Sequence, residues 1–242
     1  MKRGLLIGLM VLALALTAVF PAGAEEEKTT EILDLDAAGI RVTDVKALAE
    51  EIDGLPGLKE VLLYDSELET ADMEWLFDRY YPDIFFGFTL HIGPHEIRTD
   101  RTAFSTLHLA GKMQGDERHT SEDLEPLRMC TKMKALDLGH NYLDNADFLY
   151  WMPELEVLIL SPNYGRLLDI SPVANCKNLV YFEIFSSAIT DLSPLSGLTK
   201  LRDLNLTRDD RVTDISPLYD LPKLESRAEA ILRWLIDNHV LH

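Results

Sequence analysis

Apolar residues recur in one pattern along the second half of the chain. Three apolar positions are spaced Leu-x-x-Leu-x-Leu, and in an extended strand the last two point to the side opposite their neighbours. The three positions are occupied by Met133, Leu136, Leu138; by Leu155, Leu158, Leu160; by Leu179, Phe182, Ile184; and by Leu201, Leu204, Leu206. One such strand cannot bury its own apolar side chains, so several must stack to form a core.

The pattern has a nearly constant period. Successive first positions are 22, 24 and 22 residues apart, and Leu224 begins a further unit 23 residues later. A period between about 20 and 29 residues with this arrangement is typical of leucine-rich repeats. The sequence therefore predicts a leucine-rich repeat solenoid with parallel strands on one side and helices or short helical turns on the convex side.

Polar turn residues accompany the repeat. A residue that can bond the backbone lies eight residues after each first position: Asn141, Asn163, Ser187 and Asp209. The change away from Asn at the last two predicts an irregular ladder of turn contacts there.

The phrase Thr-Asp-(Leu/Ile)-Ser-Pro-Leu then occurs twice, 23 residues apart. Asp191 and Asp214 suit turns, and Pro194 and Pro217 suit the start of a short helical turn, where a missing N–H costs little. Leu195 and Leu218 are expected to fill the convex side.

These residues resemble a known family. The unit "ITDLSPLSGLTKLRDLNL", from Ile189 to Leu206, is similar to the internalin-like class of bacterial leucine-rich repeats, and the similarity covers roughly Thr131 to Glu225. The resemblance implies a curved parallel solenoid whose concave strand face commonly binds another protein.

Upstream coils are expected to be longer. Leu33 and Val61 begin strand-like segments that are further apart than the short period, and each is followed by a stretch with helical periodicity. Another coil is expected at "FSTLHLAG", with Phe104 aligned to Met133 and strand residues Leu107 and Leu109, so that about seven residues are inserted beyond the short period.

The segment Phe85–Arg98 predicts a β-hairpin inserted near the N-terminus. Phe86, Phe88, Leu90 and Ile92 alternate with their neighbours, and Gly93-Pro94 then interrupts the strand.

The two ends predict non-repeat segments. Residues 1–24 have a basic start, an apolar run and the sequence Ala-Gly-Ala, which together predict a signal peptide cleaved after Ala24; an uncleaved anchor is the alternative. Residues 25–105 are predicted to hold the irregular repeats with the hairpin, and residues 106–225 the repeats of about 22 residues. Ser226 and an apolar stripe predict a capping helix over residues 226–242, with a partner-binding helix as the alternative.

Charge excludes one class of partner. Asp and Glu number 41 against 23 Lys and Arg, which gives a net charge of −18 at pH 7. Such a surface repels phosphate backbones, so nucleic acid is not an expected partner.

Both cysteines are predicted to be free. Cys130 and Cys176 occupy the same repeat position two coils apart, three residues before Met133 and Leu179. A spacing of about 4.8 Å per coil separates their Cα atoms by about 10 Å, whereas a disulfide needs less than about 7 Å. We expect two buried thiols that pack as small apolar side chains.

Residues that flank the strand leucines are the candidate ligand-binding residues. They face the open side of the predicted sheet and combine apolar groups with acids; strand propensity alone is the alternative reason for them. The predicted set is Asp137, His140, Val157, Ile159, Tyr181, Glu183, Phe185, Asp203 and Asn205.

Other chemistry is weakly indicated. His91 and His95 have a spacing that suits a metal pair, but a Gly-Pro turn separates them. Asp209, Asp210 and Asp214 could hold calcium, but we interpret them as turn residues. The motifs Gly-x-Ser-x-Gly, His-Glu-x-x-His and a phosphate-binding loop do not occur in the sequence. We expect no catalytic residue, no metal site and no cofactor.

The predicted function is a secreted or surface-exposed monomeric scaffold that binds an extracellular or surface protein through its concave face. No membrane contact is expected after signal cleavage. A glycan-binding or cell-envelope module is one alternative, and a structural fragment without its own ligand is another.

Overall fold

The computed structural model describes residues 30–106, 118–163, 167–209 and 211–224. It divides into two compact units, Met1–Leu90 and His91–His242. Several predictions fall outside the described residues: the signal peptide, the strand positions of Leu107 and Leu109, the turn role of Asp210, and the capping helix. Among the described helices, none has the length and apolar composition needed to cross a membrane.

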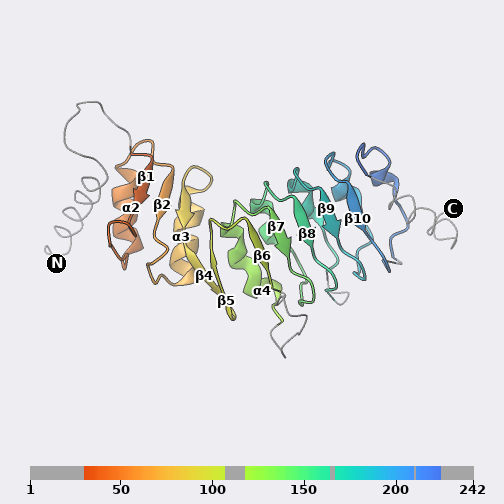
Figure 1. The fold of residues 1–242 in the computed structure, drawn as a ribbon, viewed down its shortest axis with the longest axis horizontal. Coiled ribbons are helices and arrows are strands. Elements are labelled where there is room, and N and C mark those ends of the chain that lie inside the picture. Colours follow the sequence, from red (N-terminus) through yellow and green to blue (C-terminus); the bar gives the residue numbers. More distant parts are fainter. Residues whose placement is uncertain (1–29, 107–117, 164–166, 210, 225–242) are drawn as a thin grey trace. The chain divides into compact units, whose positions relative to one another are not determined.

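The first unit is a three-stranded parallel sheet with two helices (Figure 1). The strands are β1 (Ile32–Asp34), β2 (Glu60–Leu62) and β3 (Phe85–Gly87), and their central residues Leu33, Val61 and Phe86 are in register. All three central side chains are buried. The predicted repetition of Leu33 at Val61 is therefore confirmed.

Helices α2 (Val45–Asp53) and α3 (Thr70–Tyr80) connect these strands. Asp44 caps α2, since its Oδ1 accepts hydrogen bonds from the N–H groups of Lys46 and Ala47, both at 3.1 Å. The helical apolar spacing buries one stripe of each helix: Val45, Leu48, Ala49 and Ile52 in α2, and Met73, Leu76 and Phe77 in α3.

The predicted hairpin over Phe85–Arg98 is wrong in its first part. Phe85–Gly87 forms β3 of the parallel sheet, whereas β4 (Thr89–Ile92) and β5 (His95–Arg98) form a separate two-stranded sheet. The separation of Phe86 from Val61 lies within the usual range of a repeat, and Phe86 fills the inner row beside Val61. The alternation from Phe86 to Ile92 is continuous, so it carried no sign that the chain changes partner at Phe88.

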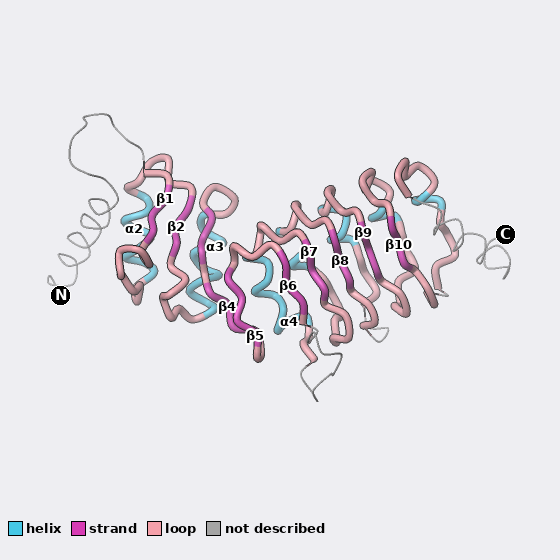
Figure 2. Tube along the Cα trace, viewed as in Figure 1, coloured by secondary structure: helices cyan, strands magenta, loops and turns pink. Residues whose placement is uncertain are grey.

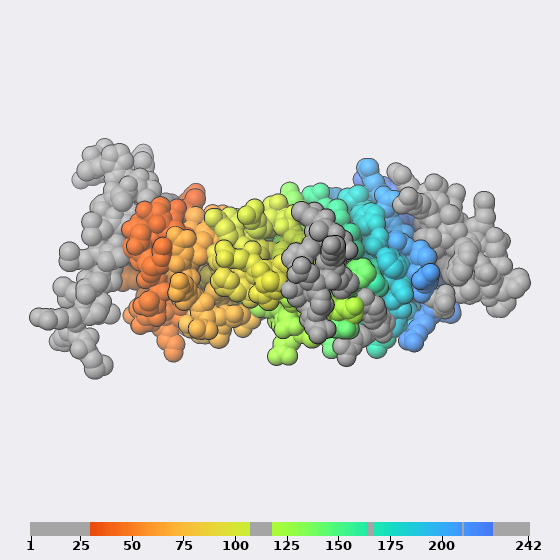
Figure 3. Space-filling view, turned by 60° about the horizontal axis from the view of Figure 1, so that its bottom comes forward, coloured from red at the N-terminus to blue at the C-terminus, as the bar shows by residue number. Residues whose placement is uncertain are grey.

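The second unit is a five-stranded parallel sheet in the order β10-β9-β8-β7-β6. Short helices lie behind it, on one side only (Figure 2), and the coils form successive bands from green to blue in the space-filling view (Figure 3). The strands are β6 (Ala103–Ser105), β7 (Ala135–Asp137), β8 (Val157–Ile159), β9 (Tyr181–Glu183) and β10 (Asp203–Asn205). The helices are α4 (Ser121–Leu124) and the 3-10 turns η1 (Glu125–Met129), η2 (Asp147–Trp151), η3 (Ser171–Asn175), η4 (Ser193–Leu195) and η5 (Ser216–Leu218).

The inner row of this sheet is the core of the second unit. Its members are the central strand residues, which lie in register on the side that faces the helices: Phe104, Leu136, Leu158, Phe182 and Leu204. The last four are buried and Phe104 is half-buried. The predicted leucine-rich repeat solenoid is thus confirmed for the coils that follow the short period.

The predicted alignment of Phe104 with Met133 is wrong. Phe104 pairs with Leu136, and the N–H of Thr106 donates to the carbonyl of Asp137 at 3.1 Å. The first coil of this unit therefore runs from Phe104 to Leu136, and it is longer than the predicted coil from Phe104 to Met133. Phe104 and Leu107 both suit the inner row by their spacing, and only the backbone hydrogen bonds to β7 distinguish the two registers.

The turn ladder is present and changes chemistry along the array. Asn141 Oδ1 accepts from His119 N–H at 2.9 Å, and Asn163 Oδ1 accepts from Leu143 N–H at 3.3 Å. At the next positions Asp209 Oδ1 accepts from both the N–H and the Oγ–H of Ser187, at 2.6 and 2.8 Å. A carboxylate donates no hydrogen bond, and Ser187 supplies the donors instead. The predicted irregularity is confirmed.

The Asp-x-Ser-Pro corners begin three of the 3-10 turns, as predicted for Asp191 and Asp214. Oδ1 of Asp169, Asp191 and Asp214 accepts from the N–H of the serine two residues later, at 2.8 Å in each case. Proline lies in the first turn of η3, η4 and η5, and Leu195 and Leu218 are buried.

Acid is expected to destabilise these corners. Hydrogen bonds from the following serine lower the pKa of all three carboxyls; the N–H of Ser193 and of Ser216 is the largest cause for Asp191 and Asp214, and the Ser171 hydroxyl for Asp169. A lowered folded-state pKa contributes stability that is complete above the unfolded value, about 3.9, and is lost as pH falls through the folded value. Replacing all three by Asn should therefore flatten the fall in the free energy of unfolding between about pH 5 and 2. Urea unfolding at a series of pH values measures this dependence of the free energy of unfolding on pH. The control is the variant Asp83→Asn/Asp220→Asn, which changes two exposed carboxyls. If the triple variant and the parent had the same dependence on pH, the prediction would be contradicted.

The two cysteines are free and buried, as predicted. Burial raises the pKa of both thiols to about 12, so almost no thiolate forms at neutral pH. We expect no reaction of either thiol with Ellman's reagent at pH 8 in the native protein, and reaction of both in denaturant. Rapid native labelling of one thiol would show that its coil opens or that its burial is wrong.

Candidate functional site

The side of the second sheet opposite the helices carries the candidate site (Figure 2). We call it the open face, and define it as the outward strand residues Ala103, Ser105, Ala135, Asp137, Val157, Ile159, Tyr181, Glu183, Asp203 and Asn205. Strand pleating puts them there, because residues on either side of each inner-row residue point away from the core. Ala103 and Ser105 are exposed and the other eight are half-buried.

Strand register arranges these residues in two rows. The first row reads Ala103, Ala135, Val157, Tyr181, Asp203, and the second reads Ser105, Asp137, Ile159, Glu183, Asn205. Small side chains therefore lie at the β6 end of the first row and larger ones toward β10. The same face carries three carboxylates, and none of its ten residues is Lys or Arg.

A hydrogen-bond network fixes the polar part of the open face at β9 and β10. Oη–H of Tyr181 donates to Glu183 Oε2 at 2.7 Å, and Asn205 Nδ2 donates to the same oxygen at 3.3 Å. Asn205 Oδ1 accepts from the N–H and Oγ1–H of Thr207, at 3.1 and 2.7 Å. These side chains are held in place before any ligand arrives, which reduces the entropy lost on binding.

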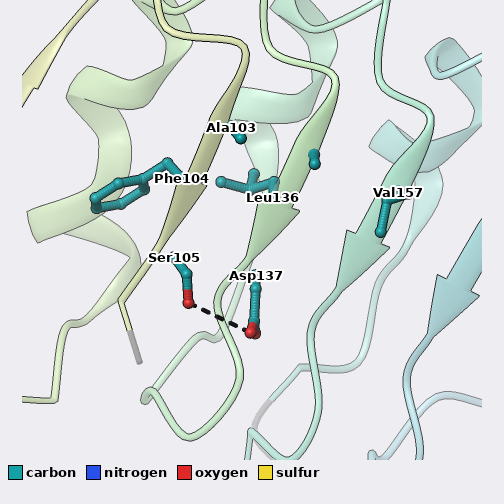
Figure 4. A pocket seen from close by; sticks show the side chains of 7 residues that line it. Ala103, Phe104, Ser105, Leu136, Asp137 and Val157 are labelled. Atoms are coloured by element: carbon teal, nitrogen blue, oxygen red, sulfur yellow. Dashed lines mark hydrogen bonds between the residues drawn. The ribbon is translucent and has the colours of Figure 1, made fainter. Parts of the chain in front are cut away.

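A hollow of about 310 Å³ lies on the open face over β6, β7 and β8 (Figure 4). It is lined by Ala103, Phe104, Ser105, Ala135, Leu136, Asp137 and Val157. Ser105 and Asp137 point toward each other at one end, where Ser105 Oγ donates to Asp137 Oδ2 at 3.3 Å. The rest of the lining is apolar: Ala103, Ala135 and Val157 belong to the open face, whereas Phe104 and Leu136 belong to the inner row.

The structure brings seven of the nine predicted binding residues together on the open face. The other two follow the strand ends: Phe185 is half-buried beyond β9, and His140 lies in the turn after β7 with φ 64°. The N–H of His140 donates to the carbonyl of Pro162 at 2.8 Å, so its backbone belongs to the coil-to-coil contacts.

Sequence reasoning missed residues in both units. Ala103 and Ser105 were missed because the strand was expected at Leu107 and Leu109. In the first unit, Ile32, Leu62 and Phe85 are outward strand residues, and Ile32 is 52% exposed. Two features of the sequence indicate these outward positions: the alternation in "EILDL", and the separation of Phe86 from Val61, which is close to one repeat.

Metal and turn chemistry can be placed on the described residues. No group of three or more His, Cys, Asp or Glu side chains is arranged there to hold a metal ion. His91 is exposed, whereas the ring of His95 packs edge-on against Phe104 with centroids 5.4 Å apart. Asp209 and Asp214 bond Ser187 and Ser216, which accounts for both as turn residues.

Comparison with known proteins found similarity to solved internalin structures. No family model matches the sequence, and no curated protein matches it. Internalin C2 from Listeria monocytogenes is 22% identical over 72% of this chain and 72% of its own, with a TM-score of 0.44. An internalin F structure from the same species is 22% identical over 76% of this chain and 50% of its own, with a TM-score of 0.42. The functional domain of internalin J, which includes a cysteine ladder, is 14% identical over 81% of this chain and 57% of its own, with a TM-score of 0.19.

The fold defines the class. Parallel strands in register, buried inner rows and the asparagine turns make the second unit a leucine-rich repeat solenoid. The solved structures compared above are internalins. The chain spans half the length of the internalin F structure.

Proposed function

We propose that this protein is a secreted or surface-exposed scaffold that binds another protein through the open face, after export by the leader predicted in residues 1–24. One observation carries the proposal. Val157, Ile159 and Tyr181 stay half-buried on the open face, although the inner row already supplies the core. Apolar side chains bordered by carboxylates are typical of a surface that binds a protein.

The geometry of the face supports protein binding over chemistry on a small molecule. The apolar residues lie on rigid strands across successive coils, and the network around Glu183 fixes the polar groups beside them. A face of this kind offers a broad contact with a few ordered polar anchors, as protein interfaces do.

Capture experiments with three forms of the chain test the proposal. The full chain, the variant Tyr181→Ala/Phe185→Ala and the variant Tyr150→Ala are used as baits for bacterial-surface and host extracellular proteins. Tyr150 is 50% exposed in η2, on the helical side, so it is a matched control for loss of an aromatic residue. Circular dichroism verifies that each bait is folded.

We expect a partner that the parent and Tyr150→Ala capture and that the double variant loses. Equal capture by all three baits would reject the open face as the binding site. If no protein is captured, protein binding is rejected under these conditions, and a glycan array with the same three baits tests the rival ligand class.

A further inference from the structure

The hollow on the open face has the size of a side-chain subsite. Its volume of about 310 Å³ is at the lower end of the range for ligand pockets, roughly 300–1,000 Å³. The first row explains its shape, because Ala103 and Ala135 leave space that the larger residues at the same register positions in β8 and β9 occupy. A space lined in this way can take one large apolar side chain.

The polar end of the hollow is a fixed carboxylate. Asp137 Oδ1 accepts from Gly139 N–H at 3.1 Å, and Oδ2 accepts from Ser105 Oγ at 3.3 Å. An ionised carboxylate has about four acceptor sites, so both oxygens keep capacity for further donors. A donor that approached here would meet an oriented negative group beside an apolar wall.

The surrounding charge selects the sign of that donor. Asp137, Glu183 and Asp203 are the charged residues of the open face, and the whole chain has a net charge of −18. Lys134 is the nearest basic residue before Asp137 in the sequence, and its Nζ forms an ion pair with Glu156 Oε1 at 3.8 Å. Two copies of this chain would bring like charges together if their open faces met, which disfavours self-association there.

We propose that the hollow is the anchor subsite for a basic protein segment. It receives one leucine-sized apolar side chain, and Asp137 binds a Lys or Arg next to that side chain. This inference rests on the proposed function and specifies the chemistry of its partner. Apolar burial supplies affinity, and the carboxylates of the open face select cationic segments over acidic ones.

Synthetic peptides and the full chain test the subsite. Three labelled peptides share one length: one with Leu between lysines, one with Gly between lysines, and one with Leu between glutamates. Fluorescence polarisation measures their affinity for the parent and for the variants Ala135→Leu, Ala103→Leu and Asp137→Asn. Ala37→Leu, an exposed position in the first unit, and Asp83→Asn are the matched controls.

We expect the lysine–leucine peptide to bind best. Ala135→Leu and Ala103→Leu, which fill the hollow, should each lower the affinity for this peptide about tenfold or more, as expected for losing the burial of one Leu side chain. Asp137→Asn should weaken it about two- to fivefold and reduce its salt dependence. The controls should leave the affinity unchanged. Because Ala103 is exposed, Ala103→Leu tests the hollow even if Ala135→Leu fails to fold.

Three results would overturn the inference: equal binding of the glutamate–leucine peptide, unchanged affinity in the filled variants, or no binding by any peptide. Failure of the inference is separable from failure of the proposed function. A captured partner that is lost with Tyr181→Ala/Phe185→Ala but retained with Ala135→Leu and Ala103→Leu would keep the open face and reject the hollow.

Discussion

Replacing Phe182 by Ala is expected to lower the free energy of unfolding by about 3–5 kcal/mol. Phe182 is fully buried in the inner row and lies in register between Leu158 and Leu204. Truncation removes the ring from apolar surroundings and leaves a cavity between two coils. Because each coil of a solenoid contacts only its neighbours, few side chains can move to fill that cavity. Urea unfolding followed by circular dichroism at ambient temperature measures the change.

Phe185→Ala is the matched control, because it removes the same side chain from the same coil. Phe185 is half-buried beyond the end of β9, so its loss should cost about 1 kcal/mol. If the two variants lost equal stability, the inner row would not be the main core of the second unit.

Asn141→Ala is expected to cost about 2–4 kcal/mol, the second largest effect. Oδ1 of Asn141 accepts from His119 N–H at 2.9 Å, while Nδ2 donates to Thr106 Oγ1 at 2.8 Å and to the Leu138 carbonyl at 3.0 Å. Asn141 is buried, so its loss leaves backbone groups without these partners away from water. The same urea titration measures the change.

Asn175→Ala removes an asparagine hydrogen bond at the surface. Its Nδ2 donates to the Tyr150 carbonyl at 2.7 Å, in an exposed setting where water can replace it. We expect a loss of no more than about 1 kcal/mol. A loss in Asn141→Ala as small as this would mean that the ladder contributes little to the stability of the coils.

The outward position of most residues in the predicted set could be read from the sequence because strand alternation is a local property. Once Leu136, Leu158, Phe182 and Leu204 are placed inward, their neighbours must point outward, whatever else the chain does. Seven of the nine predicted residues lie on the open face for this reason. His140 and Phe185 lie past the strand ends, where alternation no longer fixes direction.

The hollow could not be predicted in the same way. Its lining comes from three strands, and its inner-row residues Phe104 and Leu136 are separated by one long coil of the chain. The sequence offered two apolar residues for the inner row of that coil, Phe104 and Leu107, which differ by three positions. Choosing the wrong one removes Ala103 and Ser105 from the face, and with them the space they border.

The period of the coils, the parallel stacking of their strands, the burial of Cys130 and Cys176, and the turn roles of Asp191 and Asp214 all followed from the sequence. Each of these depends on spacing within one repeat, which the pleat and the turn chemistry dictate locally. Three outcomes required the folded chain: Phe85–Gly87 joins the first sheet, Phe104 pairs with Leu136, and Asp209 bonds Ser187. Those outcomes depend on which backbone groups of a neighbouring coil are in reach, and one coil does not contain that information.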